Sequence, residues 1–377
     1  MTINQLFFEL IRVAIGNAVC LSHTPTAKEW QMLYEMAKKQ SLVGICFAGM
    51  QRLQGQMQCP PEQLYLQWMG MSAKIQQRNE VVNRQCAELQ AKLSDSGFQS
   101  TIMKGQGVAW LYSEPLRALR QSGDIDVLLW KDVLSASENR KAVMKFAQQI
   151  DANATGSAHH VAVHMWRDTT SHSTGSGQAG SAQVEVELHY EASYMCNPWA
   201  NKRLQVWMRE NRVNVKRLKL KEGEFDVPSV KFNIVFLLAH IFRHYVSEGV
   251  GLRQLMDYYW TLSNSPIKGE NFIPLLDSFN MKKFASAVMW VLGYVFGLDR
   301  DYMICEPDER LGRKLLDHIM QGGNFGHHNE NTVMSKKSHL GMFVNQLVHD
   351  IHLAVDYPYE ALWSPLSMIC EFVRIRV

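Results

Sequence analysis

Apolar residues recur at helical spacing in the first quarter of the chain. Between residues 4 and 95 they return every three or four positions, which is the period of one face of a helix. Pro60 and Pro61 suit the first turn of a longer helix, and residues 95–97 (Asp-Ser-Gly) are a stop signal. The pattern predicts a helical N-terminal region over residues 1–95.

The pattern changes between residues 96 and 228. Short runs of β type, separated by glycine-containing turns, predict strands at residues 98–103, 125–129, 160–165 and 184–190, with one helix near 135–150. Residues 168–183 are nearly all Ser, Thr, Gly, Ala and Gln, so we predict a mobile hairpin loop between the last two strands.

Helical periodicity returns after residue 229 and continues to residue 377. The predicted fold class is therefore α+β. A mixed-sheet core over residues 96–228 is flanked by a helical region at 1–95 and a helical domain at 229–377.

Composition and charge exclude several classes of protein. Of the 377 residues 46% are apolar and the net charge is +3, which argues against a disordered chain and against a protein that coats polyanions. The seven cysteines lack paired spacing and are expected to be mostly buried thiols in a reducing compartment. The first residues lack a basic segment before the apolar stretch, and the longest uncharged apolar run, residues 284–298, is shorter than a bilayer requires. We expect a cytoplasmic protein without a membrane segment.

The sequence Gly-Asp-Ile-Asp-Val-Leu-Leu at residues 123–129 carries the sharpest chemical signal. Alternation along a strand places Asp124 and Asp126 on one face, where two carboxylates can share hard divalent cations. The alternative is a solvated strand start, because Gly-Asp is also common in turns.

A second acidic strand follows at residues 184–190. Glu185, Glu187 and His189 share one face of it, and three carboxylates are enough to hold the two cations of a two-metal transferase. An edge hairpin with one wet face is the alternative.

Histidines raise the possibility of a metallohydrolase. His240 and His244 stand four apart, a spacing that can bind zinc, but no Glu completes an H-E-x-x-H motif. We expect these two side chains to pack between helices or to line a cleft. His159, His160 and His164 lie near the first hairpin strand.

Basic residues cluster between Arg203 and Lys221. Glu210, Glu222 and Glu224 interleave with them, so a solvated surface is favoured over a nucleic-acid interface. The nearby Trp199 and Trp207 are expected to anchor the core.

Taken in order, these motifs resemble those of the nucleotidyltransferase superfamily typified by DNA polymerase beta. The chain is most similar to the bacterial uncharacterised nucleotidyltransferase family. The resemblance is carried by Met103-Lys104-Gly105, by Tyr112, Pro115 and Arg117, by Gly123 to Leu129, and by Glu187-Leu188-His189-Tyr190. Residues 237–245 and 252–262 resemble the family's His-containing and Asp-containing helices.

The resemblance implies a role for each motif. Asp124, Asp126 and Glu187 would be catalytic and would hold two Mg²⁺ ions, with Glu185 as the rival for the third position. Nucleotide-binding positions would be Lys104 and Arg120, which neutralise phosphate charge, Gly105, Gln106 and Gly107, whose backbone N–H groups cradle a phosphate, and Gly123. His189, His240 and His244 would line the cleft beside Glu185.

The implied activity is Mg²⁺-dependent transfer of a nucleoside monophosphate from an NTP, with ATP as the expected donor, to a hydroxyl of a small molecule or a protein. The glycine turn reads Gly105-Gln106 where many active members of the superfamily have Gly-Ser. The alternative is therefore a catalytically degenerate module of the same fold that binds a nucleotide or a protein partner.

Overall fold

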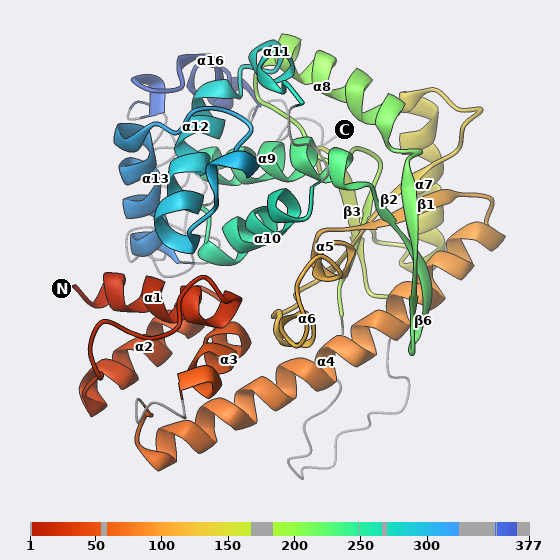
Figure 1. Cartoon of the computed structure of the whole chain (residues 1–377). Coiled ribbons are helices and arrows are strands. Elements are labelled where there is room, and N and C mark those ends of the chain that lie inside the picture. The colour runs from red at the N-terminus through yellow and green to blue at the C-terminus, as the bar shows by residue number, and fades with distance from the viewer. Residues whose placement is uncertain are drawn as a thin grey trace.

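The computed structural model of the chain describes residues 2–53, 59–166, 184–247, 249–265, 270–323, 351 and 353–367. These residues form an α+β protein with a small mixed sheet between helical regions, as predicted (Figure 1). The predicted hairpin loop at 168–183 lies outside the described residues.

The N-terminal region is helical, as predicted, with α1 (Ile3–Ile15), α2 (Ala27–Lys39), α3 (Val43–Leu53) and α4 (Glu62–Asp95). Thr2 and Thr26 form capping boxes that satisfy the first backbone N–H groups of α1 and α2. The long helix α4 begins directly after Pro61 and ends before Gly97, which has a φ of 73°. In Figure 1, α4 extends from the N-terminal helices to the sheet.

The main sheet has the order β1 (Gln99–Met103), β2 (Ile125–Trp130), β4 (Val186–His189), β3 (His160–Val163). The β2 and β4 strands are parallel, whereas β1 pairs with β2, and β3 with β4, in antiparallel fashion. All four predicted strands are confirmed, although β3 and β4 are shorter than predicted. The predicted helix is also present, as α7 (Ala136–Ile150).

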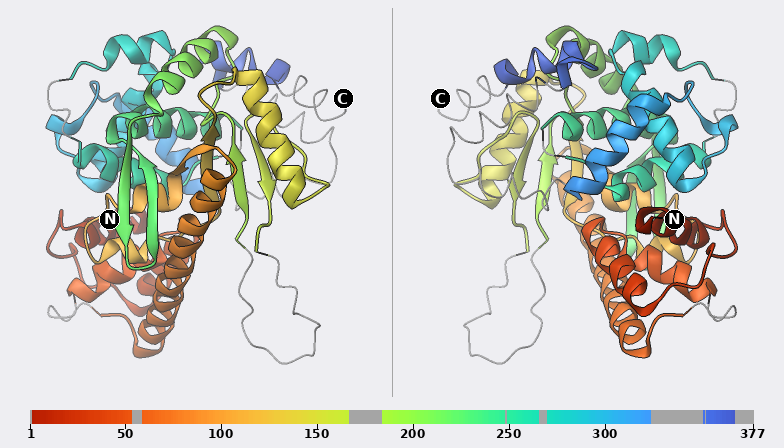
Figure 2. Two further views of the ribbon diagram at one scale, coloured as in Figure 1. Left: turned by 90° about the vertical axis from the view of Figure 1, so that its right-hand side faces the viewer. Right: turned by 90° about the vertical axis from the view of Figure 1, so that its left-hand side faces the viewer.

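The sheet separates two hydrophobic cores. Val127 and Leu129 belong to a core shared with α4 and α7, whereas Leu128 and Trp130 belong to a larger core shared with the N- and C-terminal helices. Figure 2 shows α7 lying beside β3 and β4, and α4 beside the hairpin of residues 215–228. Because side chains alternate, Asp126 lies on the same face as Leu128 and Trp130, toward the C-terminal helices.

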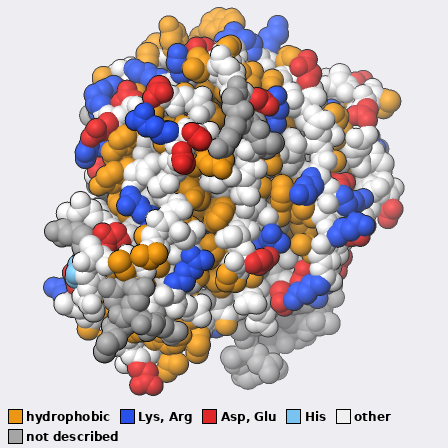
Figure 3. Space-filling model, in the orientation of Figure 1, with side chains coloured by type: hydrophobic (Ala, Val, Ile, Leu, Met, Phe, Trp, Pro, Cys, Tyr) orange, Lys and Arg blue, Asp and Glu red, His pale blue; other side chains and the backbone are white. Residues whose placement is uncertain are grey.

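A second hairpin, β5 (Val215–Leu220) and β6 (Gly223–Pro228), follows α8 (Pro198–Asn211), and β6 lies next to β1. These strands are absent from the four predicted above, since three of the six residues of β5 are charged and they do not alternate with the apolar ones. Basic residues of the hairpin form ion pairs. Lys219 Nζ lies 3.6 Å from Glu224 Oε1, and Lys221 Nζ lies 2.7 Å from Glu80 Oε1. Figure 3 shows this mixture of charges over the hairpin. A solvated surface fits this arrangement.

Trp199 does not anchor the core, which corrects the prediction. Its side chain is 60% exposed and contacts Trp363 edge to face. Trp207 is half-buried and stacks on the buried Phe232, as expected of an anchor. Of the cysteines, Cys46, Cys86 and Cys305 are buried, Cys196 is half-buried, and Cys20 and Cys59 are exposed.

The C-terminal part is helical over the residues described. Its elements are α9 (Val230–Ser247), α10 (Leu252–Ser263), α11 (Ile273–Ser278), α12 (Lys282–Val291), η2 (Leu292–Phe296), η3 (Arg300–Tyr302), α13 (Glu309–Gly322) and α16 (Pro358–Ala361). None of the described helices is long and apolar enough to cross a membrane.

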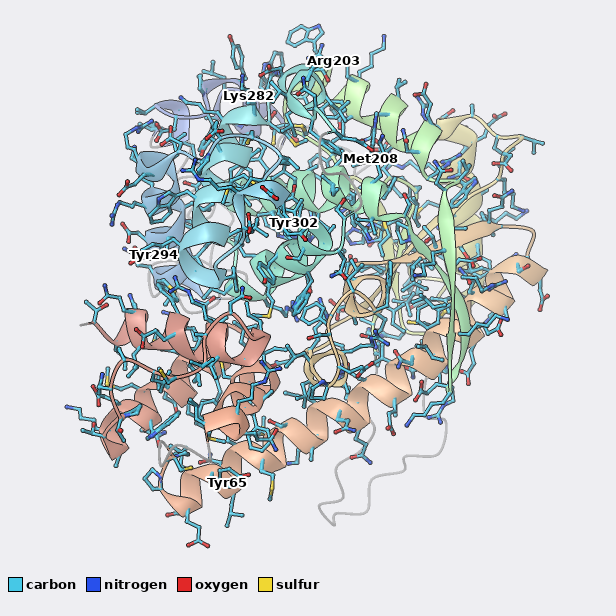
Figure 4. All side chains as sticks on the ribbon, in the orientation of Figure 1. Tyr65, Arg203, Met208, Lys282, Tyr294 and Tyr302 are labelled. Carbon is cyan, nitrogen blue, oxygen red and sulfur yellow. The ribbon has the colours of Figure 1, made fainter. Side chains whose placement is uncertain are left out.

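The N- and C-terminal helices share one core. Phe8 of α1 packs edge-on against Tyr294 of η2, which Figure 4 labels. Gln40 donates to the carbonyl of Ile319 and accepts from the N–H of Leu252. The division of the chain at residues 95 and 228 stays a prediction, but the two helical regions pack as one body around the large core.

Candidate active site

The register of the sheet brings one lysine and two carboxylates together. Met103 pairs with Asp126, and Asp126 pairs with Glu187. Lys104 directly follows β1, and its ammonium contacts the carboxylate of Asp126 and lies 3.9 Å from that of Glu187. Three segments far apart in the sequence therefore meet at one edge of the sheet.

The turn after β1 positions Lys104. Both Lys104 (φ 41°) and Gly105 (φ 29°) have left-handed backbones, and Gly105 lies inside the short helix α5 (Lys104–Ala109). A Cβ at Gly107 would lie 2.0 Å from the carbonyl oxygen of Ile102. Gly107 is thus required for the close packing of α5 on β1. The side chain of the buried Gln106 donates to Asn83 of α4.

Negative charge accumulates around the start of β2. Asp126 is buried, whereas Asp124 is exposed and precedes the strand. Partial burial of its carboxyl group, together with the charges of Asp126, Glu187 and Glu185, raises the pKa of Asp124. The backbone carbonyl of Glu185 accepts the N–H of Ile125 at 2.9 Å, which holds Glu185 beside this end of β2.

Glu187 is the carboxylate that the structure places against Asp126. Burial would raise its pKa, but the hydrogen bond with His189 and the charge of Lys104 outweigh burial and hold that pKa well below its usual range. Glu187 is therefore a poor proton acceptor and a good ligand for a cation. The charge of Glu185 contributes to the raised pKa of Asp124.

Three histidines line the other side of the carboxylates. His189 Nε2 lies 3.0 Å from both Asp126 Oδ1 and Glu187 Oε2, and His160 Nε2 lies 3.7 Å from Glu187 Oε1. Burial lowers the pKa of His159 well below its usual value and that of His160 to about 4, so both rings are neutral at physiological pH.

Arg120 has a different partner from the one predicted. Its guanidinium is 4% exposed and binds both oxygens of Asp257 on α10, each at 2.7 Å. The hydroxyl of Tyr112 donates to the same carboxylate at 2.6 Å. A bidentate phosphate contact by Arg120 does not fit this arrangement, because the fork of the guanidinium already holds a carboxylate.

The Arg120–Asp257 pair holds the loop that leads to Asp124. Arg120 ends the short helix α6 (Leu116–Leu119), and Arg253 of α10 donates to the carbonyl of Gln121 at 3.0 Å. Burial and the charge of Arg120 lower the pKa of Arg253 to about 10. Gly123 follows within this loop, where its carbonyl is 3.5 Å from Arg78.

His240 and His244 pack between helices. Both are buried, and their rings lie nearly perpendicular with centroids 4.3 Å apart. Burial, followed by the charge of Lys104, lowers the pKa of His240, which shows that this ring lies near the site. Arg243, between them in sequence, approaches His244 Nε2 at 2.9 Å and lies over the ring of Tyr194. That His240 and His244 line a cleft stays a prediction.

Sequence reasoning assigned no role to Asp257, Arg253 or Arg243. Asp257 carried a signal, because a lone acid in the apolar helix Leu-Arg-Gln-Leu-Met-Asp-Tyr-Tyr-Trp needs a partner when buried. Its partner, Arg120, lies 137 positions away and could not be identified from spacing.

Among the described residues, two groups of side chains could hold a metal ion. One consists of Asp126, Glu187 and His189, and the other of His159, His160 and His189; in each, one ligand atom per residue lies within 4.8 Å of the others. Asp124 lies outside both groups.

Comparison with known proteins identifies the family of the chain. The family described as uncharacterised nucleotidyltransferase matches residues 26–297. The chain belongs to this family. The match includes all the site residues described above and confirms the resemblance inferred from the motifs.

No curated protein matches this nucleotidyltransferase-family chain. Among solved structures, an antigenic nucleotidyltransferase-like protein from Paracoccidioides brasiliensis is similar, with 14% sequence identity and a TM-score of 0.37. The alignment covers 63% of this chain and 97% of that protein.

Proposed function

We propose that this member of the nucleotidyltransferase family transfers a nucleoside monophosphate from an NTP, with ATP as the donor, to a hydroxyl of a small molecule or a protein. The observation that carries the proposal is the meeting of Asp126, Glu187 and Lys104 at one sheet edge, with Asp124 beside them.

The residues fit divalent cations. Asp124, Asp126 and Glu187 supply carboxylate oxygens, the ligands that Mg²⁺ prefers. Burial, followed by the negative charges of Asp126, Glu187 and Glu185, raises the pKa of Asp124. Asp124, Asp126 and Glu187 would hold two Mg²⁺ ions, which would polarise the phosphates and the acceptor hydroxyl.

The protein's own contribution is to orient charges and groups. In the reaction the acceptor oxygen attacks the α-phosphorus, the bond from that phosphorus to the pyrophosphate oxygen breaks, and the hydroxyl proton leaves to solvent. Lys104 supplies a positive charge that would neutralise phosphate oxygens as pyrophosphate departs. The backbone N–H groups of residues 105–107 would cradle a phosphate, while the side chain of Gln106 is engaged with Asn83.

Arg120 takes a positioning role in this proposal. Its pair with Asp257 fixes the loop that carries Gly123 and Asp124, and thereby the direction from which Asp124 approaches a cation. Loss of the pair is expected to weaken activity through this loop.

Isothermal titration of the purified protein with a non-hydrolysable ATP analogue, with and without Mg²⁺, tests the proposal. Binding that requires Mg²⁺ and disappears in the double variant Asp124→Ala/Asp126→Ala is expected. Asp132→Ala is the matched control, because Asp132 is an exposed acid just past the other end of β2. Binding that is unchanged in the double variant would overturn the assignment of these carboxylates.

A degenerate binding module is the second candidate function. The side chain of Arg120, predicted to neutralise phosphate charge, is engaged within the protein. So is the side chain of Gln106, which stands where many active members of the superfamily have Ser. These observations favour the second candidate. The same titration separates the two candidates. Mg²⁺-independent binding, or no binding of any of the four NTPs, would support the degenerate module.

A further inference from the structure

Three imidazoles gather beside the carboxylates of Asp126 and Glu187, which are called the acidic edge below. His159 and His160 lie at the start of β3, His189 ends β4, and the antiparallel register pairs His160 with His189. The ring centroids of His189 lie 5.2 Å from His159 and 5.0 Å from His160. His159 and His189 are 3% and 0% exposed.

We propose that His159, His160 and His189, together with Glu187, bind a divalent transition-metal ion of the zinc or cobalt class. The site adjoins Asp126, because His189 Nε2 lies 3.0 Å from both Asp126 Oδ1 and Glu187 Oε2. It goes beyond the proposed function and does not depend on nucleotide transfer.

The spacing of the ligand atoms fits an ion of this class. Zn²⁺ binds nitrogen and oxygen at about 2.0–2.2 Å, so neighbouring ligand atoms around it lie roughly 3 Å apart. One ring nitrogen of each of His159, His160 and His189 lies within 4.8 Å of the others. Glu187 adjoins two of these rings, with Oε1 at 3.7 Å from His160 Nε2 and Oε2 at 3.0 Å from His189 Nε2. The strands already bring these groups within reach of one ion.

Buried ring nitrogens without hydrogen-bond partners also support the proposed metal site. Within the described residues, the Nδ1 atoms of His159 and His189 have no hydrogen-bond partner, although both rings are buried. An unpaired polar atom in such a place is costly, and an ion coordinated through Nδ1 would use it. Ser157 Oγ lies 3.1 Å from His160 Nδ1 and orients that ring, whose Nε2 lies toward Glu187.

The kind of ligand selects the kind of ion. Imidazole nitrogen suits zinc and its neighbours in the transition series, whereas Mg²⁺ takes oxygen ligands. The two negative charges of Asp126 and Glu187 face the single positive charge of Lys104. The remaining negative charge favours binding of a divalent metal ion. When the ion binds a ring nitrogen that carries a proton, that proton is released to solvent.

The test uses the full chain, stripped of metal with a chelator and titrated with Co²⁺. Visible absorption reports nitrogen ligation, and calorimetry with Zn²⁺ gives the affinity. In His160→Gln the affinity for Co²⁺ is expected to fall at least by the 10–100-fold that loss of an outer partner costs. The matched control is His164→Gln, because His164 is exposed just beyond β3 and should leave binding unchanged.

Two further measurements keep the outcome unambiguous. Zn²⁺ should raise the Tm of the wild type and of His164→Gln but not that of His160→Gln, whose circular dichroism confirms folding. Asp124→Asn should lose Mg²⁺-dependent nucleotide binding and retain Co²⁺. Wild-type protein that binds neither Co²⁺ nor Zn²⁺, or His160→Gln that binds like wild type, would overturn the histidine site and leave the nucleotide proposal standing.

Discussion

Two groups of charged side chains stand on either side of the loop at residues 120–124, and they differ in how completely their charges are paired. In the Arg120–Asp257 group, one guanidinium holds both oxygens of one carboxylate, and Tyr112 adds a third hydrogen bond. In the Lys104–Asp126–Glu187 group, one ammonium faces two carboxylates.

The difference indicates what each group does. A matched, buried pair has no affinity left for a ligand and serves to fix the backbone. The unmatched group lies near the ends of the strands, where Asp124 and Glu185 add further negative charge. It therefore retains electrostatic attraction for cations. The fold uses the first group to hold the second in position.

The largest expected effect is a loss of nucleotide transfer when the Lys104–Asp126–Glu187 group is changed. Asp126→Ala is expected to abolish nucleotide transfer, a loss of at least about 100-fold, because an acid that binds a metal cannot be replaced by a methyl group. Transfer of label from α-labelled ATP into small-molecule and protein fractions would measure it. Asp132→Ala should keep wild-type transfer, and full turnover by a folded Asp126→Ala protein would show that the unmatched group is not catalytic.

The second prediction is that the free energy of unfolding depends more on the Arg120–Asp257 group than on the Lys104–Asp126–Glu187 group. Asp257→Asn leaves Arg120 buried without a counter-charge, and is expected to lower the free energy of unfolding by about 3–5 kcal/mol. Asp126→Asn should cost much less, because it also relieves repulsion from Glu187. Urea denaturation followed by circular dichroism would give both values. Equal losses for the two variants would remove the distinction between a structural and a functional group.

A third buried carboxylate, Glu360 of α16, sharpens the comparison, because its contacts are backbone N–H groups. It accepts from Cys196 at 2.7 Å and from Asn197 at 3.3 Å. Burial raises its pKa from 4.5 to about 7, although these hydrogen bonds partly offset the effect.

The sign of the pH dependence follows from that raised pKa. The stabilisation by protonated Glu360 is complete below pH 4.5 and is lost as the pH rises to about 7. The expected loss in free energy of unfolding is about 3 kcal/mol. Thermal melts of wild type, Glu360→Gln and the exposed control Glu306→Gln across this range would measure it. Glu360→Gln should lack this part of the pH dependence, and identical profiles for all three proteins would contradict the assignment.

Much of the fold could be predicted from local pattern. Prolines and glycine mark both ends of α4, and alternation marks β2 and β4, since each of these signals acts over a few residues. The β5–β6 hairpin was not among the predicted strands, because three of the six residues of β5 are charged and they do not alternate with the apolar ones. The exposure of Trp199 was missed for a related reason, because size and hydrophobicity alone do not say which side of α8 faces the core.

The sequence by itself determined the residues of the acidic edge. Alternation predicted a shared strand face for Glu187 and His189 and another for Asp124 and Asp126, although Asp124 precedes β2 in the structure. Only the tertiary structure decided which of these groups meet and which are already paired. The parallel register of β2 and β4 sets Asp126 against Glu187 and brings Lys104 to both, whereas helix α10 delivers Asp257 to Arg120. Except for Lys104 with Asp126, these pairings join residues more than 60 positions apart. Electrostatic partners at that separation are chosen by the packing of elements, which no local pattern encodes.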